Sequence, residues 1–126
     1  MGRLAAAPSL AEAVSTLLDD ALTRYTAARR PAGCMILSGR VSDTQNQRKI
    51  VLKLRERRSR QQTAIAVALG RWLGLGESTI VSDYLITHLI GYSMRARDGA
   101  KAVELRRTVP MVLKGALAAV GMTDGE

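Results

Sequence analysis

A run of basic residues is the first feature of the sequence with the potential for chemistry. The segment RKIVLKLRERRSR, residues 48–60, holds seven lysines and arginines. Such a density of positive charge can bind phosphate groups or an acidic partner. Aliphatic residues interrupt the run at helical spacing, which favours a solvated helix face over phosphate contact. Because no aromatic residue is interleaved, a platform for stacking single-stranded bases is not expected.

Three further features are better explained by structure than by chemistry. Cys34 precedes the apolar residues 35–37, which favours a buried core residue over a redox or ligand-sensing thiol. His88 is the only histidine, so a His–His metal pair is excluded. We interpret it as a packing residue, with a hydrogen bond in a pocket or an interface as the alternative. The segment GLGES (74–78) lacks the lysine of a phosphate-binding loop, which favours a turn between helices.

The sequence shows no catalytic machinery. It contains no paired carboxylates in an apolar context, no convincing Ser–His–Asp set and no cluster with metal-ligand spacing. We therefore predict that the protein is not an enzyme and binds neither a metal nor a cofactor.

Composition points to one helical domain. The chain has 126 residues, 47% of them apolar but only 3% aromatic, so the core must consist mainly of aliphatic side chains, which suits helix packing. A single cysteine fits a reducing compartment, and no apolar run of about 18 residues could span a membrane. We therefore predict a cytoplasmic protein without a membrane segment. The formal net charge of +8 favours an anionic partner.

Hydrophobic periodicity predicts four helices. The first begins with Ser9 as N-cap and continues until Pro31 and Gly33. The second opens at Ser42, and glycines end it near Trp72. Its apolar face includes Ile65 and Leu69, whereas its middle is polar nearly all round.

The other two predicted helices span 79–97 and 101–120. The helix at 79–97 is apolar around most of its circumference, so it must be buried on more than one side. In so small a domain we expect its own core to cover only one side and another subunit to cover the other. Pro110 lies inside the last predicted helix, where it should remove one hydrogen bond and cause a kink.

Two segments resemble one known family. The sequence GYSMRARDGA, residues 91–100, resembles the end of the buried helix in the ligand-binding and dimerisation domain of TetR-type transcriptional regulators. RPAGCMIL, residues 30–37, resembles the segment between the first and the long helix of that domain. The resemblance runs in order over about 10–120. The family's N-terminal helix-turn-helix head is absent from this chain, Lys101 replaces a frequent Ser or Thr cap, and Pro110 is unusual at its position.

The resemblance implies an all-α bundle whose last two helices form a four-helix bundle across a dimer axis, with Gly99 allowing the reversal between them. We expect residues 1–8 to be an extension, 9–121 the domain and 122–126 a tail. The expected interface residues are Leu85, Leu89, Tyr92, Leu105, Val109 and Leu113. The expected ligand-facing residues are Tyr25, Met35, Leu69, Trp72 and His88.

By resemblance, the function is that of the effector-binding and dimerisation part of a TetR-like repressor. The expected partners are a second copy of the chain and a small apolar effector, with operator DNA bound only through the missing head of a full-length parent. One alternative is a naturally headless protein that forms heterodimers with a full-length regulator. Another is a direct nucleic-acid binder that uses Arg48–Arg60.

Overall fold

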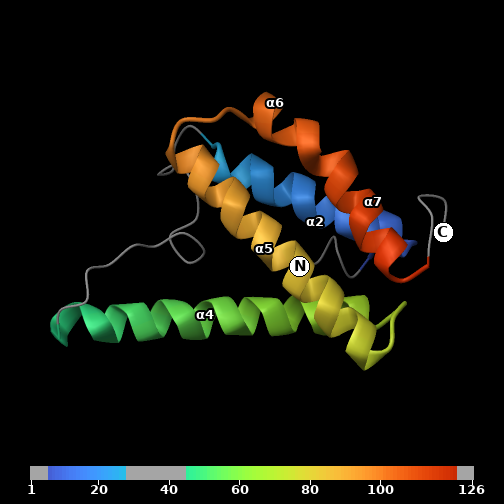
Figure 1. The fold of residues 1–126 in the computed structure, drawn as a ribbon, viewed down its shortest axis with the longest axis horizontal. Helices are drawn as coiled ribbons and strands as arrows, with labels where there is room; N and C mark the ends of the chain where they lie inside the picture. Colours follow the sequence, from blue (N-terminus) through green and yellow to red (C-terminus); the bar gives the residue numbers. More distant parts are fainter. Residues whose placement is uncertain (1–5, 28–44, 122–126) are drawn as a thin grey trace.

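Helices make up all the regular structure in the described part of the chain. The computed structural model describes residues 6–27 and 45–121. In chain order the elements are α2 (Leu10–Tyr25), α4 (Gln45–Leu69), α5 (Leu75–Arg97), α6 (Ala102–Leu105), the 3-10 helix η1 (Arg106–Thr108) and α7 (Val109–Ala119). Figure 1 shows α4 on one side of α5, with α2 and α7 on the other. The predicted all-α architecture is confirmed.

Helix α2 begins as predicted and ends earlier. The Ser9 hydroxyl accepts a hydrogen bond from the Glu12 N–H at 3.2 Å, so Ser9 is the N-cap. The predicted end at Pro31 and Gly33 is wrong, because the helix stops at Tyr25. There the Thr26 hydroxyl donates to the Leu22 carbonyl at 2.7 Å, a local bond that competes with helix continuation. The buried side of α2 is lined by Leu10, Ala11, Ala13, Val14, Leu17, Leu18, Ala21, Leu22 and Tyr25.

The corner between α4 and α5 lies four residues earlier in the chain than predicted. Helix α4 ends at Leu69 and not at Trp72–Leu73; the Leu69 carbonyl accepts from the N–H groups of Trp72 and Leu73 at 3.0 and 3.1 Å. Helix α5 begins at Leu75, four residues before the predicted start. Gly74 adopts an extended conformation as its N-cap, and its carbonyl accepts from Ser78 N–H at 2.9 Å. The predicted start of the long helix at Ser42 lies outside the described residues.

Helix α5 is the centre of the fold. It packs against α4, α2 and α7 of the same chain. The expectation that the chain's own core could cover only one side of this helix is therefore wrong. The physical reason is that helices of its own chain pack on more than one side of it, so most of its apolar circumference is used within one chain.

The reversal after α5 has the glycine geometry that the sequence suggested. Gly99 has a φ of 100°, a conformation that residues with a Cβ rarely adopt. Its N–H bonds to the Ala96 carbonyl, and Ala100 N–H bonds to the Arg95 carbonyl, both at 3.0 Å. This pair of bonds is a Schellman motif, which satisfies the last carbonyls of α5 and turns the chain back.

The last predicted helix is divided into α6, η1 and α7. The prediction that Pro110 kinks a continuous helix is wrong. Pro110 lies in the first turn of α7. At that position the missing N–H has no intrahelical partner to lose, so proline is tolerated. Arg106 of η1 contacts α2, where its guanidinium donates to the Asp19 carboxylate at 3.0 Å and to the Thr23 hydroxyl at 3.1 Å.

Candidate ligand groove and association face

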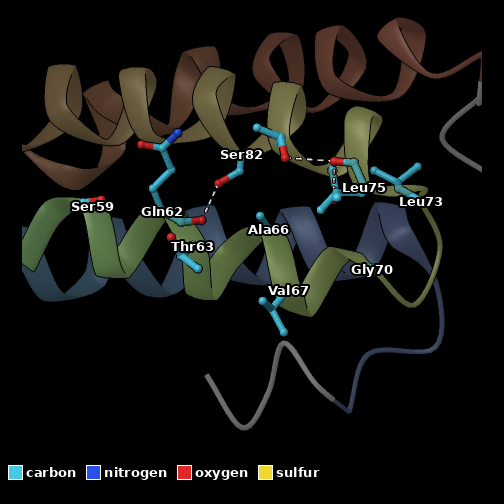
Figure 2. Close-up of a pocket in the computed structure, with 11 residues that line it drawn as sticks. Ser59, Gln62, Thr63, Ala66, Val67, Gly70, Leu73, Leu75 and Ser82 are labelled. Carbon is cyan, nitrogen blue, oxygen red and sulfur yellow. Dashed lines mark hydrogen bonds between the residues drawn. The ribbon is translucent and has the colours of Figure 1, made fainter.

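A groove of about 490 Å³ lies between α4 and α5, next to the corner that joins them. Figure 2 shows the two helices with the lining side chains between and beside them. Its volume is within the usual range of small-molecule sites. The lining residues are Ser59, Gln62, Thr63, Ala66, Val67, Gly70, Leu73, Leu75, Ser78, Thr79 and Ser82.

Three side chains of α5 that line the groove donate hydrogen bonds to backbone carbonyls. The Ser82 hydroxyl donates to the Gln62 carbonyl of α4 at 2.7 Å, a bond that joins the two helices (Figure 2). Ser78 and Thr79 donate to the Leu75 carbonyl at 3.2 and 2.8 Å. Ser78 and Ser82 are buried, and each is satisfied by a backbone carbonyl, as buried polar groups require.

The predicted ligand-facing residues do not gather at one place. Tyr25 is buried at the C-terminal end of α2. Leu69 is buried, and Trp72 is half-buried, at the opposite end of that helix, where Arg71 donates to the carbonyl of Ala7 at 3.0 Å. Because α2 has 16 residues, about 24 Å of helix separates the two ends.

Of the other two predicted ligand residues, the structure describes only His88. Half-buried His88 lies between two tyrosines of α5, with ring centroids 4.7 Å from Tyr84 and 6.5 Å from Tyr92. Met35 lies outside the described residues. None of the four described residues of the predicted ligand set, Tyr25, Leu69, Trp72 and His88, lines the groove, whose lining positions are mostly small or polar.

Most of the expected interface residues belong to the core of a single chain. The side chains of Leu85, Leu89 and Leu105 are at most 1% exposed, and Tyr92 is buried with its hydroxyl 2.7 Å from that of Thr108. Val109 and Leu113 are half-buried against the same core. These residues therefore offer little surface to a partner.

A different face of α5 and α7 remains exposed and carries apolar residues. Ile80 and Met111 are 64% and 71% exposed. Gly91 and Ala118 lie exposed on the same two helices. The half-buried ring of Tyr84 lies over Gly115, where a Cβ would collide with its hydroxyl. The face is defined by Ile80, Tyr84, Thr87, Gly91, Met111, Gly115 and Ala118, and we call it the association face.

The sequence contained a signal for this face. On α5 the residues at 80, 84, 87 and 91 repeat at helical spacing. The signal was hidden because the buried residues on the same helix follow an equally regular pattern.

The basic segment lies on the first half of α4. Ile50 and Leu52 there are exposed, and so are most of its lysines and arginines. Arg60 forms an ion pair with Glu56 one turn earlier. The predicted solvated face is consistent with this exposure.

Neither metal ligands nor membrane spans are found in the described ranges. No group of three or more His, Cys, Asp or Glu side chains there is placed to hold a metal ion. None of the described helices is long and apolar enough to cross a membrane.

Comparison with known proteins identifies the fold. No protein-family model matches the sequence, and no curated protein matches it either. Two solved structures match in three dimensions. Both are cysteine mutants of the TetR family transcriptional regulator CifR, complexed with 26-base-pair double-strand operator DNA.

Both matches extend over nearly all of this chain and part of the other. The first has a TM-score of 0.79 and 23% sequence identity over 89% of this chain, and the second has 0.79 and 22% over 88%. The match spans 62% and 61% of the two regulator chains. The chain therefore has the fold of the larger part of a TetR family transcriptional regulator, as the resemblance of its two motifs had predicted.

Proposed function

We propose that this chain is the effector-binding and dimerisation body of a TetR-like transcriptional repressor and not an enzyme. The observation that carries the proposal is the three-dimensional match, which covers 89% of this chain at a TM-score of 0.79. CifR was solved in complex with operator DNA. By analogy, operator DNA would be bound by a full-length regulator, through a part of that regulator that lies outside the match to this chain.

The exposed association face supports a homodimer. Large apolar side chains such as Ile80 and Met111 lose solvent contact when two such faces meet, which is favourable by about 25 cal/mol per Å² of apolar surface. Small residues at Gly91, Gly115 and Ala118 allow helices to approach closely. A two-fold arrangement would bring the same face of each copy together, as is usual in dimers.

The dimer is tested by light scattering at tens of micromolar. We expect the wild-type chain to have twice the mass of one chain and the double variant Ile80→Asp, Met111→Asp to have the mass of one. Both positions are exposed, so the variant keeps its core. Leu52→Asp is the matched control, because Leu52 is an exposed aliphatic residue on α4 outside the association face.

A monomeric wild-type chain, or a double variant that stays dimeric, would contradict the proposed dimer. A substitution such as Leu89→Asp is less informative. It would place a charge in the core of one chain and unfold it whether or not a dimer exists.

A further inference from the structure

The groove between α4 and α5 changes in polarity along its length. At the corner its walls combine the apolar side chains of Val67, Leu73 and Leu75 with the hydroxyl groups of Ser78 and Thr79 in the first turn of α5. Away from the corner they are polar and come from Ser59 and Gln62, with Thr63 beside them. Figure 2 shows these two groups at opposite ends of the groove. Eleven residues separate Ser59 from Gly70, which corresponds to about 16 Å of helix.

None of the described residues that line this groove has an ionisable side chain. A charged ligand would lose part of its hydration without gaining a counter-charge, which is strongly unfavourable. An uncharged ligand pays no such penalty. The lining therefore selects neutral molecules, although the net charge of the whole chain is +8.

The hydroxyl groups of α5 also restrict the ligand. A hydroxyl has one proton to donate and two lone pairs to accept. Ser78, Thr79 and Ser82 already donate their protons to backbone carbonyls. Of these three residues only Thr79 is exposed, so its oxygen is an acceptor at the corner end of the groove, whereas the acceptor at the polar end is the carboxamide oxygen of Gln62. Half-buried Gln62 adds a carboxamide at the polar end.

We propose that this groove binds a neutral amphiphile, with a hydrocarbon chain toward Leu73 and Leu75 and an uncharged, hydrogen-bond-donating head toward Gln62 and Thr63. Primary amides and alcohols of medium chain length have this chemistry. The inference rests on the proposed effector-binding role and names a site for it. None of the described residues of the ligand set expected from the family resemblance lines this groove.

The first experiment uses octanamide as the probe for the full chain, followed by backbone amide shifts in NMR titration. We expect saturable shifts concentrated at residues 59–82. Octanoate, which carries a charge on a chain of equal length, should bind at least about tenfold more weakly. N,N-dimethyloctanamide, which lacks donor protons, should bind about threefold to tenfold more weakly.

Chain length tests the apolar end. Between hexanamide and octanamide, each added CH₂ should tighten binding by about twofold to fourfold, since each buries more apolar surface. Equal affinities for octanamide and octanoate, no dependence on chain length, or no saturable shifts up to the solubility limit would each overturn the inference.

Two variants locate the site. Ala66→Phe fills the groove and should abolish the octanamide shifts, whereas Ala64→Phe, at an exposed position that does not line the groove, should retain them. Gln62→Leu tests the polar end without filling it and should reduce the preference for octanamide over the dimethyl amide. A folded Ala66→Phe variant that binds as tightly as wild type, or an unchanged preference in Gln62→Leu, would overturn the inference.

The same samples separate this inference from the proposed dimer. Light scattering on each titration sample reports the mass of the assembly. A dimer that does not bind octanamide contradicts the groove inference alone. A monomer that binds it with the expected preferences contradicts the dimer and leaves the groove inference standing.

Discussion

The two long helices, α4 and α5, are almost equal in length and differ completely in how the fold uses them. Helix α5 has buried residues from Ser78 to Ala96, nearly end to end, and contacts α2, α4, α6 and α7. Helix α4 has its fully buried residues only near its end, at Ile65 and Leu69. Its first half extends past the rest of the described bundle (Figure 1).

The difference shows that a helix can be anchored at one end and remain well formed. Tertiary packing supplies most of the stability of α5, as it does for most helices in proteins. The stability of the first half of α4 depends instead on the intrinsic helix propensity of its residues. It is also weakened by like charges, because Lys49, Lys53 and Arg57 lie one turn apart on one side.

The largest expected effect comes from the anchored end of α4. Leu69→Ala should lower the free energy of unfolding by about 2–5 kcal/mol, since it leaves a cavity at a fully buried position. Leu52→Ala, on the same helix but 53% exposed, should change it by less than about 0.5 kcal/mol. Urea denaturation of both variants measures the contrast. Equal losses would show that α4 is buried along its whole length.

A smaller effect is expected where α5 meets η1. Tyr92→Phe removes the hydrogen bond with Thr108 and should cost about 0.5–1.5 kcal/mol, because the ring stays buried while one polar partner is lost. Tyr84→Phe is the control, since Tyr84 is half-buried and its ring lies over Gly115. Thermal unfolding followed by circular dichroism compares the two. If Tyr92→Phe were as stable as wild type, the bond would not contribute to the anchoring of α5.

The smallest expected effect is a gain in helix stability in the first half of α4. Lys53→Glu places a carboxylate one turn from both Lys49 and Arg57, and each new pair should stabilise the helix by about 0.2–0.5 kcal/mol. Hydrogen exchange of amides 48–60 should slow in this variant. Lys53→Gln removes the repulsion from Lys49 and Arg57 and also the attraction to Glu56 three residues away, and it should slow the exchange less. Faster exchange in Lys53→Glu would contradict the conclusion that repulsion between like charges destabilises the first half of α4.

Local signals in the sequence predicted much of the fold. Ser9 starts α2, and Gly99 ends α5 in a left-handed conformation, because each of these residue types has a specific physical role at a helix end. Gly74 misled the prediction, since a glycine can also serve as an N-cap. Pro110 was expected to kink a continuous helix, whereas it lies in the first turn of α7, because the chain divides the expected helix just before it.

The candidate site was much less predictable. Periodicity identified Leu85, Leu89 and Leu105 as apolar positions of a helix face, but a pattern does not say whether a face meets its own chain or a partner. The groove was missed because its residues are mostly small and polar. Ser59 and Thr79 become parts of one site only when α4 and α5 pack together.

The Ser82–Gln62 bond also bears on the order in which the chain assembles. It joins residues 20 apart, whereas the Arg106–Asp19 contact joins residues 87 apart. For a flexible chain, closing the longer loop costs about 1.3 kcal/mol more in conformational entropy. The α4–α5 corner can therefore form while the rest of the chain is still open, and the docking of η1 on α2 must wait for the slower search between distant segments.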